Sequence, residues 1–484
     1  MSTRPNRRQF LALGGLAAAA VTLPVTLPAT SASADALDGD PIPFAGDPWH
    51  RADRVVRSVR RPRIPARSVA VTDFGAVGDG VTDATGAFRD AIAWLTERGG
   101  GRVVVPAGDY LTGAIHLESR IDLHVAEGAT LLFSTDPAAY LPVVPTRDGG
   151  IECMNYSPFI YAHGKHDVAI TGTGVLDGQA DDAHWWPWAG KKNHGWVPGM
   201  PTASAAVARL EAMVDAGVPV AERVMGEGSY IRPSLIETNG CERVLISGVT
   251  VHRTPNWQIH PVLCTDVTVE NVVASSHGPN NDGCDPESCR RVLIQGCTFD
   301  TGDDCIAIKA GKNTDGRRVN VPTEDVVIQD CTFLMGHGGI TIGSEMTGGV
   351  RGLYARDCVI ESTELNQGVR LKTNSLRGGF IEDVHVKNVT MTNVADSVLL
   401  VDFTYGEGEG HGFNPVVRNI SLENVTVGTA KYPVYAAGYD DDHISGITLR
   451  NVRVDKASAQ SVFRNCDDVT FQDVVVNGAQ VTAP

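Results

Sequence analysis

The sequence predicts an all-β fold, a right-handed parallel β-helix, from a repeat, its spacing and its turn residues. A nine-residue pattern with alternating apolar positions recurs in units that start at residues 167, 243, 266, 291, 325, 352, 383, 419, 446 and 468. From Arg243 onward, successive units start 22 to 36 residues apart. Each unit is rich in β-branched residues, is bounded by Gly, Asn or Asp, and is too short to close a core alone. Neighbouring units must therefore stack on one another.

Two other architectures fit the repeat less well. A leucine-rich repeat would show a recurring Leu-x-x-Leu-x-Leu pattern, which is lacking, and we expect no helical stretch between the units. A β-sandwich has strands of similar length, but parallel stacking explains fixed columns of like residues better than hairpins do. We expect one solenoid over residues 69–484, preceded by a linker or N-terminal extension over residues 35–68.

Residues 1–34 are predicted to form a twin-arginine signal peptide. Arg7 and Arg8 precede an apolar run from Phe10 to Val21, and small residues at 32–34 offer a cleavage site. The alternative, an N-terminal membrane anchor, is disfavoured because the run is shorter than the roughly 20 residues that a membrane span needs. We expect a secreted protein, exported by the twin-arginine route, with no membrane partner.

Two helices are expected outside the repeat. Residues 84–98 are predicted to form a helix that ends at a Gly-Gly-Gly run and is followed by a strand, Arg102 to Val105. This segment is expected to cap the open end of the solenoid. A second helix, residues 203–225, is expected as an insertion between rungs, beside a cluster of four tryptophans: Trp185, Trp186, Trp188 and Trp196.

Most of the ten cysteines fall into two columns of the repeat. The seventh position of the unit carries Cys297, Cys331 and Cys358 where other units carry valine. The position two residues before a unit carries Cys241, Cys264, Cys289 and Cys466. Exported proteins commonly use cysteine in disulfides, but substitution for valine favours small, buried free thiols.

Charge excludes two classes of protein. The chain has 41 Lys+Arg against 57 Asp+Glu, a net charge of −16, and loss of residues 1–34 would remove three arginines and no acid, leaving −19. This balance excludes a nucleic-acid binder whose whole surface is basic. A chain with 42% hydrophobic and 20% charged residues is also no disordered acidic polymer.

Acidic and basic residues gather after three consecutive units and in the following turn. The motifs are Asn280-Asn281-Asp282-Gly283, Gly302-Asp303-Asp304, Gly336-His337-Gly338 and Arg370-Leu371-Lys372. An alignment without gaps places Asp282, Asp303 and His337 in one column, where stacked strands lie about 4.8 Å apart. Turn-forming aspartates are the alternative interpretation of any single motif.

Carboxylates this close cannot all stay ionised cheaply. Two of them about 5 Å apart repel by roughly 3 kcal/mol at an effective dielectric constant near 20, which is about two pKa units. One should hold a proton while another acts as a base. Glycoside hydrolysis needs this division of roles.

The four motifs, in this order and over this fold, resemble the signatures of glycoside hydrolase family 28, the polygalacturonases, and most of all its bacterial secreted branch. Those signatures are Asn-Thr-Asp, Gly-Asp-Asp, Gly-His-Gly and Arg-Ile-Lys. The similarity runs from about Val69 to the end of the chain. Asn281 replaces Thr and Leu371 replaces Ile, at positions without a catalytic assignment.

The resemblance implies roles for the catalytic residues. Asp303 would be the general acid, Asp282 and Asp304 the pair that activates water, and His337 the residue that supports protonation of the acid. The reaction would be a single displacement with inversion, without a covalent intermediate, a metal or another cofactor.

The resemblance also implies the substrate and its binding residues. The partner would be a pectic polysaccharide or oligogalacturonate, cleaved at α-1,4-galacturonosyl linkages by a protein that is expected to be a monomer. Arg370 and Lys372 would bind galacturonate, with Asn280 and Tyr405 as further contacts. The basic segment Lys309 to Arg318 offers more uronate contacts, or else is a solvated charged face.

Three questions stay open at this point. The tryptophan insertion either closes one end of the cleft and favours exo action, or merely packs on the solenoid. A rhamnogalacturonan hydrolase of the same family is an alternative. So is a calcium-dependent pectate lyase, in which Asp282, Asp285, Asp303 and Asp304 would supply oxygen ligands, although His337 beside them argues against it.

Overall fold

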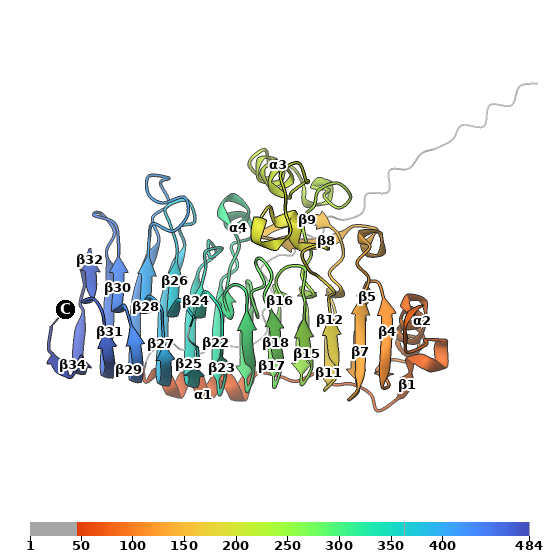
Figure 1. The fold of residues 1–484 in the computed structure, drawn as a ribbon, viewed down its shortest axis with the longest axis horizontal. Coiled ribbons are helices and arrows are strands. Elements are labelled where there is room, and N and C mark those ends of the chain that lie inside the picture. The colour runs from red at the N-terminus through yellow and green to blue at the C-terminus, as the bar shows by residue number, and fades with distance from the viewer. Residues whose placement is uncertain (1–45, 363, 484) are drawn as a thin grey trace, which may run out of the picture. The chain divides into compact units, whose positions relative to one another are not determined.

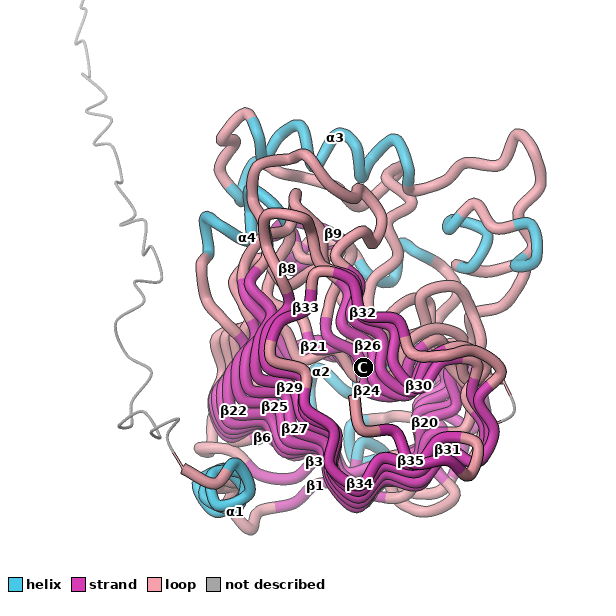
Figure 2. The backbone as a smooth tube through the Cα atoms, turned by 90° about the vertical axis from the view of Figure 1, so that its left-hand side faces the viewer, coloured by secondary structure: helices cyan, strands magenta, loops and turns pink. Residues whose placement is uncertain are grey.

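The computed structural model describes residues 46–362 and 364–483, and these form a parallel β-helix, as predicted (Figure 1). Viewed along the stack, the strands superimpose in ladders (Figure 2). The first ladder contains β1 (Ser68–Ala70), β3 (Gly101–Val105), β6 (Ile121–Val125), β11 (His166–Gly172), β14 (Glu242–Ser247), β17 (Thr265–Glu270), β19 (Arg290–Gln295) and β22 (Thr323–Gln329).

The second ladder runs beside the first and later joins it. It contains β2 (Asp79–Asp83), β4 (Gly108–Thr112), β7 (Ala129–Phe133), β12 (Val175–Asp177), β15 (Thr250–His252), β18 (Val273–Ser276), β20 (Thr298–Thr301) and β23 (Thr332–Phe333). Both ladders continue in the long strands β25 (Val350–Ile360), β27 (Phe380–Asn393), β29 (Val416–Ala430) and β31 (Ile444–Ala457). The stack ends with β33 (Cys466–Asp467), β34 (Thr470–Val476) and β35 (Ala479–Val481), the last pairing antiparallel to β34.

The third ladder is interrupted in the middle. Its first part is β5 (Ile115–His116), β10 (Ile160–His163), β13 (Ile236–Asn239) and β16 (Ile259–Val262). Its second part is β21 (Ile306–Ile308), β24 (Gly338–Ile342), β26 (Gln367–Lys372), β28 (Ser397–Asp402), β30 (Tyr432–Ala437) and β32 (Val462–Arg464). Between the parts, Cys284 pairs with both Ile259 and Ile306 through isolated bridges.

The turn residues of the repeat have a backbone reason. The first position of the unit has positive φ at Asp167, Asp266 and Asp325, and the sixth at Asn388 and Asn424, with values between 53° and 62°. Asn, Asp and Gly tolerate this left-handed conformation better than other residues. The unit therefore begins and turns where the sequence places these residue types.

The cysteine prediction is confirmed for the described chain. All ten cysteines are free, and nine of them are buried. In the column before the units, the thiol of Cys264 donates to the carbonyl of Thr238 (3.0 Å), and that of Cys289 to the carbonyl of Pro261 (3.3 Å). The cysteines thus fill valine-sized core positions while their thiols satisfy backbone carbonyls of the preceding rung.

The N-terminal part contains the predicted cap and one helix that the sequence analysis missed. The cap helix α2 (Thr85–Thr96) and strand β3 lie where they were expected. The additional helix α1 (Pro48–Ser58) falls within residues 35–68 and packs on β19, β22 and β25 (Figure 1). The predicted signal peptide, residues 1–34, lies outside the described residues. None of the helices in residues 46–483 is long and apolar enough to cross a membrane.

The insertion has a shorter helix than predicted. Helix α3 spans Ser204–Asp215, not 203–225, because Gly217 and Pro219 end it, and only a short 3₁₀ turn (Val220–Glu222) follows. The helix packs on the hairpin of β8 (Val144–Asp148) and β9 (Ile151–Asn155). The other 3₁₀ turns are Val71–Phe74, Pro137–Tyr140, Trp186–Ala189 and Lys192–His194.

A fourth helix contradicts the expectation that no helix lies between repeat units. Helix α4 (Asn313–Val319) follows β21 and contacts both α3 and β9. Lys312 beside it pairs with Glu211 of α3 (2.7 Å). The connection between two repeat units therefore holds the insertion on the solenoid.

Candidate active site

The candidate site lies where the third ladder is interrupted. Residues 284–287 take the place of a regular strand between β16 and β21, because Cys284 bridges to both strands and Glu287 to β16, and the loop at 279–283 leads into this segment. Asn281 anchors this loop, because its fully buried side chain accepts hydrogen bonds from Ser276 Oγ (2.6 Å) and Gly278 N (2.7 Å) and donates to the carbonyl of Thr254 (3.1 Å). Asn281, which replaces the threonine of the family signature, thus has a structural role. The next residue, Asp282, reaches the site.

The predicted column of Asp282, Asp303 and His337 is wrong by one residue at Asp282. The ladder pairs Cys284 with Ile306, and Ile306 with Ile340. Asp282 lies two residues before Cys284, so it falls opposite Asp304, which lies two residues before Ile306. Asp303 and His337 lie three residues before Ile306 and Ile340, so these two residues share a column as predicted. The loop before Cys284 is irregular, so an alignment without gaps could not give its register.

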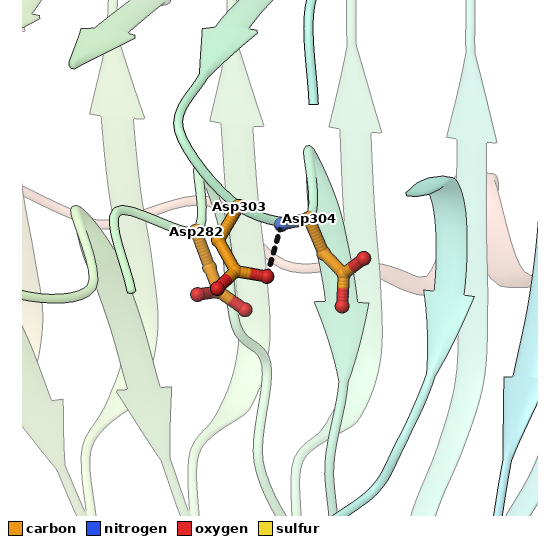
Figure 3. A group of neighbouring side chains, drawn as sticks. All are labelled: Asp282, Asp303 and Asp304. Atoms are coloured by element: carbon orange, nitrogen blue, oxygen red, sulfur yellow. Dashed lines mark hydrogen bonds between the residues drawn. The ribbon is translucent and has the colours of Figure 1, made fainter. Parts of the chain in front are cut away.

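The three carboxylates nevertheless meet (Figure 3). One oxygen from each of Asp282, Asp303 and Asp304 lies within 4.8 Å of the others. The backbone N–H of Asp304 donates to Asp303 Oδ1 (2.9 Å), which turns the two neighbouring side chains in different directions. The sequence prediction of a carboxylate cluster is confirmed in space.

Asp304 is the carboxylate that stays ionised. It is fully buried, and burial alone would raise its pKa. Lys372 Nζ donates to Oδ2 (2.6 Å) and Arg370 Nη1 to Oδ1 (3.0 Å), and these two cations lower the pKa to about 2. The cations predicted to bind substrate therefore also pair with a carboxylate of the cluster.

Asp282 is a carboxylate whose surroundings favour the protonated form. Burial, followed by the negative charge of Asp303, raises its pKa to about 7, while Lys309 opposes the shift. Because the charge on Asp303 is one of the causes, protonation of Asp303 would lower the pKa of Asp282. The two residues are thereby coupled and can share one proton.

Asp303 is the most accessible of the three carboxylates. Its side chain is 20% exposed, and its Oδ1 lies 2.9 Å from Nδ1 of His337, whose side chain is 50% exposed. The hydrogen bond with Asp303 raises the pKa of His337, although partial burial opposes this shift. The pair faces the open side of the cluster.

Lys309 is a site residue that the sequence analysis missed as such. The residue is 2% exposed, and its ammonium lies 3.2 Å from Glu345, 3.4 Å from Asp285 and 3.7 Å from Asp282. It also stands 4.5 Å from the ring centre of Trp257. A lysine within the apolar run Cys305 to Ala310 was the available signal, since such a position needs buried acidic partners.

Asp285 is a fully buried carboxylate that shares Lys309 with Asp282. Neither of its carboxylate oxygens has a hydrogen-bond partner in the described structure, apart from the ion pair with Lys309. Burial and the charge of Asp282 raise its pKa well above the ordinary value. Burial therefore favours the neutral form of Asp285, whereas Lys309 favours its ionised form.

The predicted contacts Asn280 and Tyr405 lie on different sides of the cluster. Asn280 is exposed, and its Oδ1 accepts a hydrogen bond from Arg232 Nη2 (2.8 Å), a residue that no sequence signal linked to the site. The ring of Tyr405 lies 5.1 Å from Lys372 Nζ and 5.5 Å from the Arg370 guanidinium. Sugar stacking on Tyr405 stays a prediction.

The basic segment Lys309 to Arg318 is committed to internal contacts. Lys312 pairs with Glu211, Arg318 with Asp315 (2.8 Å), and Arg317 stands over the ring of Phe413 at 3.8 Å. These contacts leave little unpaired positive charge in the segment for binding uronate groups of a substrate.

The tryptophans mostly pack, and one of them reaches the site loop. Trp185 is 2% exposed and contacts Trp188 (4.9 Å between ring centres). Trp186 Nε1 donates to the carbonyl of Thr254 (2.9 Å), and its ring covers Gly278 so closely that a β-carbon there would lie 2.2 Å away. The insertion thus contacts the loop that carries Asp282.

The cluster has the oxygen atoms that a divalent cation would need, but their charge is already offset. Ca²⁺ prefers six to eight oxygen ligands. Here Lys372, Arg370 and Lys309 contact the same group of carboxylates, and Asp282 favours its neutral form. The donor set fits proton transfer better than cation binding.

Comparison with known proteins shows the family of the chain. Residues 224–480 match the family model described as Glycosyl hydrolases family 28, and residues 68–124 match that described as Rhamnogalacturonase A/epimerase, pectate lyase-like. A probable polygalacturonase of Vitis vinifera is 30% identical over 437 residues, which cover 87% of this chain and 81% of the relative.

Two further relatives carry exo-acting names. An exo-poly-α-D-galacturonosidase of Dickeya chrysanthemi is 25% identical over 425 residues, covering 81% of this chain and 68% of the relative. The crystal structure of a hyperthermoactive exopolygalacturonase from Thermotoga maritima superimposes with a TM-score of 0.87 and 44% identity, covering 90% of this chain and 97% of that chain.

Proposed function

Because this chain belongs to glycosyl hydrolase family 28, we propose that it is an exo-acting polygalacturonase, which hydrolyses α-1,4-galacturonosyl linkages of polygalacturonate or oligogalacturonates. The observation that carries the proposal is the cluster of Asp282, Asp303 and Asp304 within 4.8 Å, with cations on one side and His337 on the other. Such a cluster offers both an acid and a base.

Proton positions assign the roles. Asp303, which is partly exposed and held by His337, protonates the glycosidic oxygen as the bond from that oxygen to the anomeric carbon breaks. Asp282 and Asp304 hold the attacking water, and Asp282 takes its proton. When Asp303 carries the shared proton, Asp282 loses a repulsive neighbour and ionises, so the productive form supplies its own base.

We propose single displacement with inversion. In this proposal Asp282 and Asp304 hold the water on the face of the sugar opposite the leaving oxygen, so no nucleophilic residue is required. The spacing itself points the other way, because inverting pairs usually lie about 6.5–9.5 Å apart. Proton NMR of the first product settles the outcome: inversion yields β-galacturonate first, whereas early α-anomer would show retention.

Exo action draws support from the relatives and the insertion. The Thermotoga maritima protein is named an exopolygalacturonase and aligns over nearly its whole length. The insertion contacts the Asp282 loop through Trp186 and is held by α4. Chromatography of products from polygalacturonate over time is the test. Small products of one size from the outset indicate release from chain ends, and a ladder of oligomers indicates internal cleavage.

The same experiment separates the alternatives. A calcium-dependent lyase would give unsaturated products that absorb in the ultraviolet, and its activity would be abolished by EDTA. A rhamnogalacturonan hydrolase would leave polygalacturonate uncut. We propose that neither occurs, because His337 and the three cations suit hydrolysis of a uronate.

We further propose that the protein is secreted through the twin-arginine route and acts as a monomer. Arg7 and Arg8 followed by a short apolar run support the export signal. Export that persists after replacement of both arginines by lysine would contradict this route, and sedimentation of the exported protein measures its oligomeric state.

A further inference from the structure

Arg232 carries a buried positive charge without a carboxylate partner. The residue is 8% exposed, and its Nη1 donates to the carbonyls of Pro255 (2.7 Å) and Pro279 (2.6 Å). Its Nη2 donates to Asn280 Oδ1 (2.8 Å). Within residues 46–362 and 364–483, no carboxylate oxygen lies at ion-pair distance from this guanidinium. Buried charges in proteins are normally paired, so a missing anion is the simplest explanation.

The other cations of the site each have a carboxylate partner. Arg370 and Lys372 contact Asp304, and Lys309 contacts Asp285 and Glu345. A substrate carboxylate that approached these cations would meet neighbouring negative charge. Arg232 has only neutral acceptors, although Asp148, Asp303 and Asp282 act on it through space. Burial lowers its pKa to about 10, which leaves it charged at neutral pH.

Its free donors suit a carboxylate. A guanidinium has five N–H groups, and the three hydrogen bonds above leave two of them unpaired within the described residues. Two N–H groups on a planar fork match the two oxygens of a carboxylate. Asn280, which orients Nη2, is exposed at the same place and two residues from Asp282.

The position of Arg232 is on the opposite side of the catalytic carboxylates from Arg370. Arg232 reaches the loops before β16 and before Cys284, on the N-terminal side of Asp282. Arg370 and Lys372 belong to β26, on the C-terminal side of the rungs that carry Asp303 and His337. Rungs are about 4.8 Å apart, so the two cationic groups face different parts of an extended substrate.

We propose that Arg232 binds the carboxylate of one of the two galacturonosyl residues at the scissile bond, the residue that lies toward the N-terminal end of the solenoid. Arg370 and Lys372 bind the carboxylate of the other residue, which lies toward the C-terminal end. This inference rests on the proposed function and deepens it. A cleft that requires a uronate on both sides selects homogalacturonan over a polymer in which uronate alternates with a neutral sugar. It also disfavours methyl esters at both positions.

The test is the selectivity between an acid and its ester. Trigalacturonate and its fully methyl-esterified form are compared as substrates of the full chain, by kcat/KM. In Arg232→Gln we expect kcat/KM for trigalacturonate to fall about 10- to 100-fold, the loss of a charged hydrogen-bonded contact, with less than about threefold change for the ester. If the wild-type protein does not cleave the ester, its competitive inhibition constant takes the place of kcat/KM.

A structural role of Arg232 gives a different result. If the arginine only holds the loops at Pro255 and Pro279, kcat/KM in Arg232→Gln falls by the same factor for the acid and for the ester. The acid-to-ester ratio of kcat/KM then stays constant, which overturns the inference. Arg232→Lys keeps the charge and should recover part of the selectivity. It also provides the test if the glutamine variant fails to fold.

Arg223→Gln is the matched control. Arg223 is 2% exposed and also donates to backbone carbonyls, those of Val218 (2.8 Å) and Glu152 (3.1 Å), but it has a carboxylate partner in Asp315 (2.7 Å). Its substitution should lower thermal stability and leave the acid-to-ester ratio unchanged. Failure of the wild-type protein to cleave trigalacturonate would refute the proposed function itself, independently of Arg232.

Discussion

Asp303 and Asp304 are neighbours in the chain, yet their side chains have different surroundings. Asp304 is fully buried between Arg370 and Lys372, which lower its pKa to about 2. Asp303 is partly exposed beside His337. Burial and neighbouring charge therefore differ within one peptide unit, which favours the ionised form of Asp304 and leaves Asp303, the proposed acid, partly accessible.

Replacement of the proposed acid tests this division. We expect Asp303→Asn to lower kcat on polygalacturonate by about 10²- to 10⁴-fold, the usual contribution of a general acid, while circular dichroism stays that of the wild type. Asp300→Asn is the control, because Asp300 lies nearby but pairs with His277 (3.1 Å) outside the cluster. Near-normal turnover in Asp303→Asn would assign the acid elsewhere.

Lys309 should set the pH range of activity. Its charge lowers the pKa of both Asp282 and Asp285, so Lys309→Met raises both. The proposed active form carries one proton shared by Asp282 and Asp303. In the variant, the pH at which this form gains a further proton and the pH at which it loses its proton are both higher. We expect the pH profile of kcat/KM to move upward by about one to two units.

Lys387→Met is the control for Lys309. Lys387 also pairs with a glutamate, Glu423 (3.3 Å), and also lies over a tryptophan, Trp49 (5.5 Å), but far from the cluster in the stack. Its pH profile should match that of the wild type. A profile of Lys309→Met that does not move would show that Lys309 only supports the fold.

At the scale of elements, helix α1 holds several rungs together. Ala52 and Val55 pack on Leu293, Val327 and Tyr354 of the first ladder. Arg51 pairs with Asp325 at 2.6 Å, and both side chains are buried. A helix within the segment that was predicted as a linker or N-terminal extension therefore contributes a buried ion pair and a small apolar core to the outside of the solenoid.

Loss of Arg51 should be costly. Arg51→Ala leaves Asp325 buried without this partner, and removal of one member of a buried pair commonly costs about 3–5 kcal/mol. We expect a lower midpoint in urea, measured by circular dichroism, with kcat at permissive conditions unchanged. Arg54→Ala, an exposed position on the same helix, should change stability by less than about 0.5 kcal/mol. Equal midpoints for the two variants would contradict the role given to α1.

At the scale of the whole molecule, the acidic net charge is compatible with an anionic substrate. The chain has a net charge of −16, but exposed charges beyond roughly 8 Å are largely screened at about 0.15 M salt. Arg232, Arg370 and Lys372 give local positive charge where the substrate is proposed to lie. The attraction is local, although the molecule as a whole repels a polyanion.

Lys372 tests this local attraction. We expect Lys372→Ala to raise KM for polygalacturonate and to lower kcat, together by about tenfold or more, because it removes a uronate contact and a partner of Asp304. Lys456→Ala, an exposed lysine on β31, should leave both constants unchanged. Unchanged constants in Lys372→Ala would remove the basis for a cationic cleft.

The sequence by itself determined the repeat and the four motifs. Alternation with period two assigns each side chain to the core or the surface, and Asp, Asn or Gly marks the turns with positive φ. These signals are local, so they predicted the solenoid, the cap helix, the cysteine columns and the carboxylate cluster. The motif order was enough to indicate the family.

Only the tertiary structure decided which charges meet. The irregular loop before Cys284 shifts Asp282 by one residue relative to the predicted column, and connections of different length between rungs bring Lys309, Arg232 and helix α1 to partners far away in the chain. A pattern of residue types does not give the register between neighbouring rungs or the partners of their side chains. Both depend on contacts between residues that are far apart in the sequence. The protonation of the cluster depends on those contacts and could not be predicted from spacing alone.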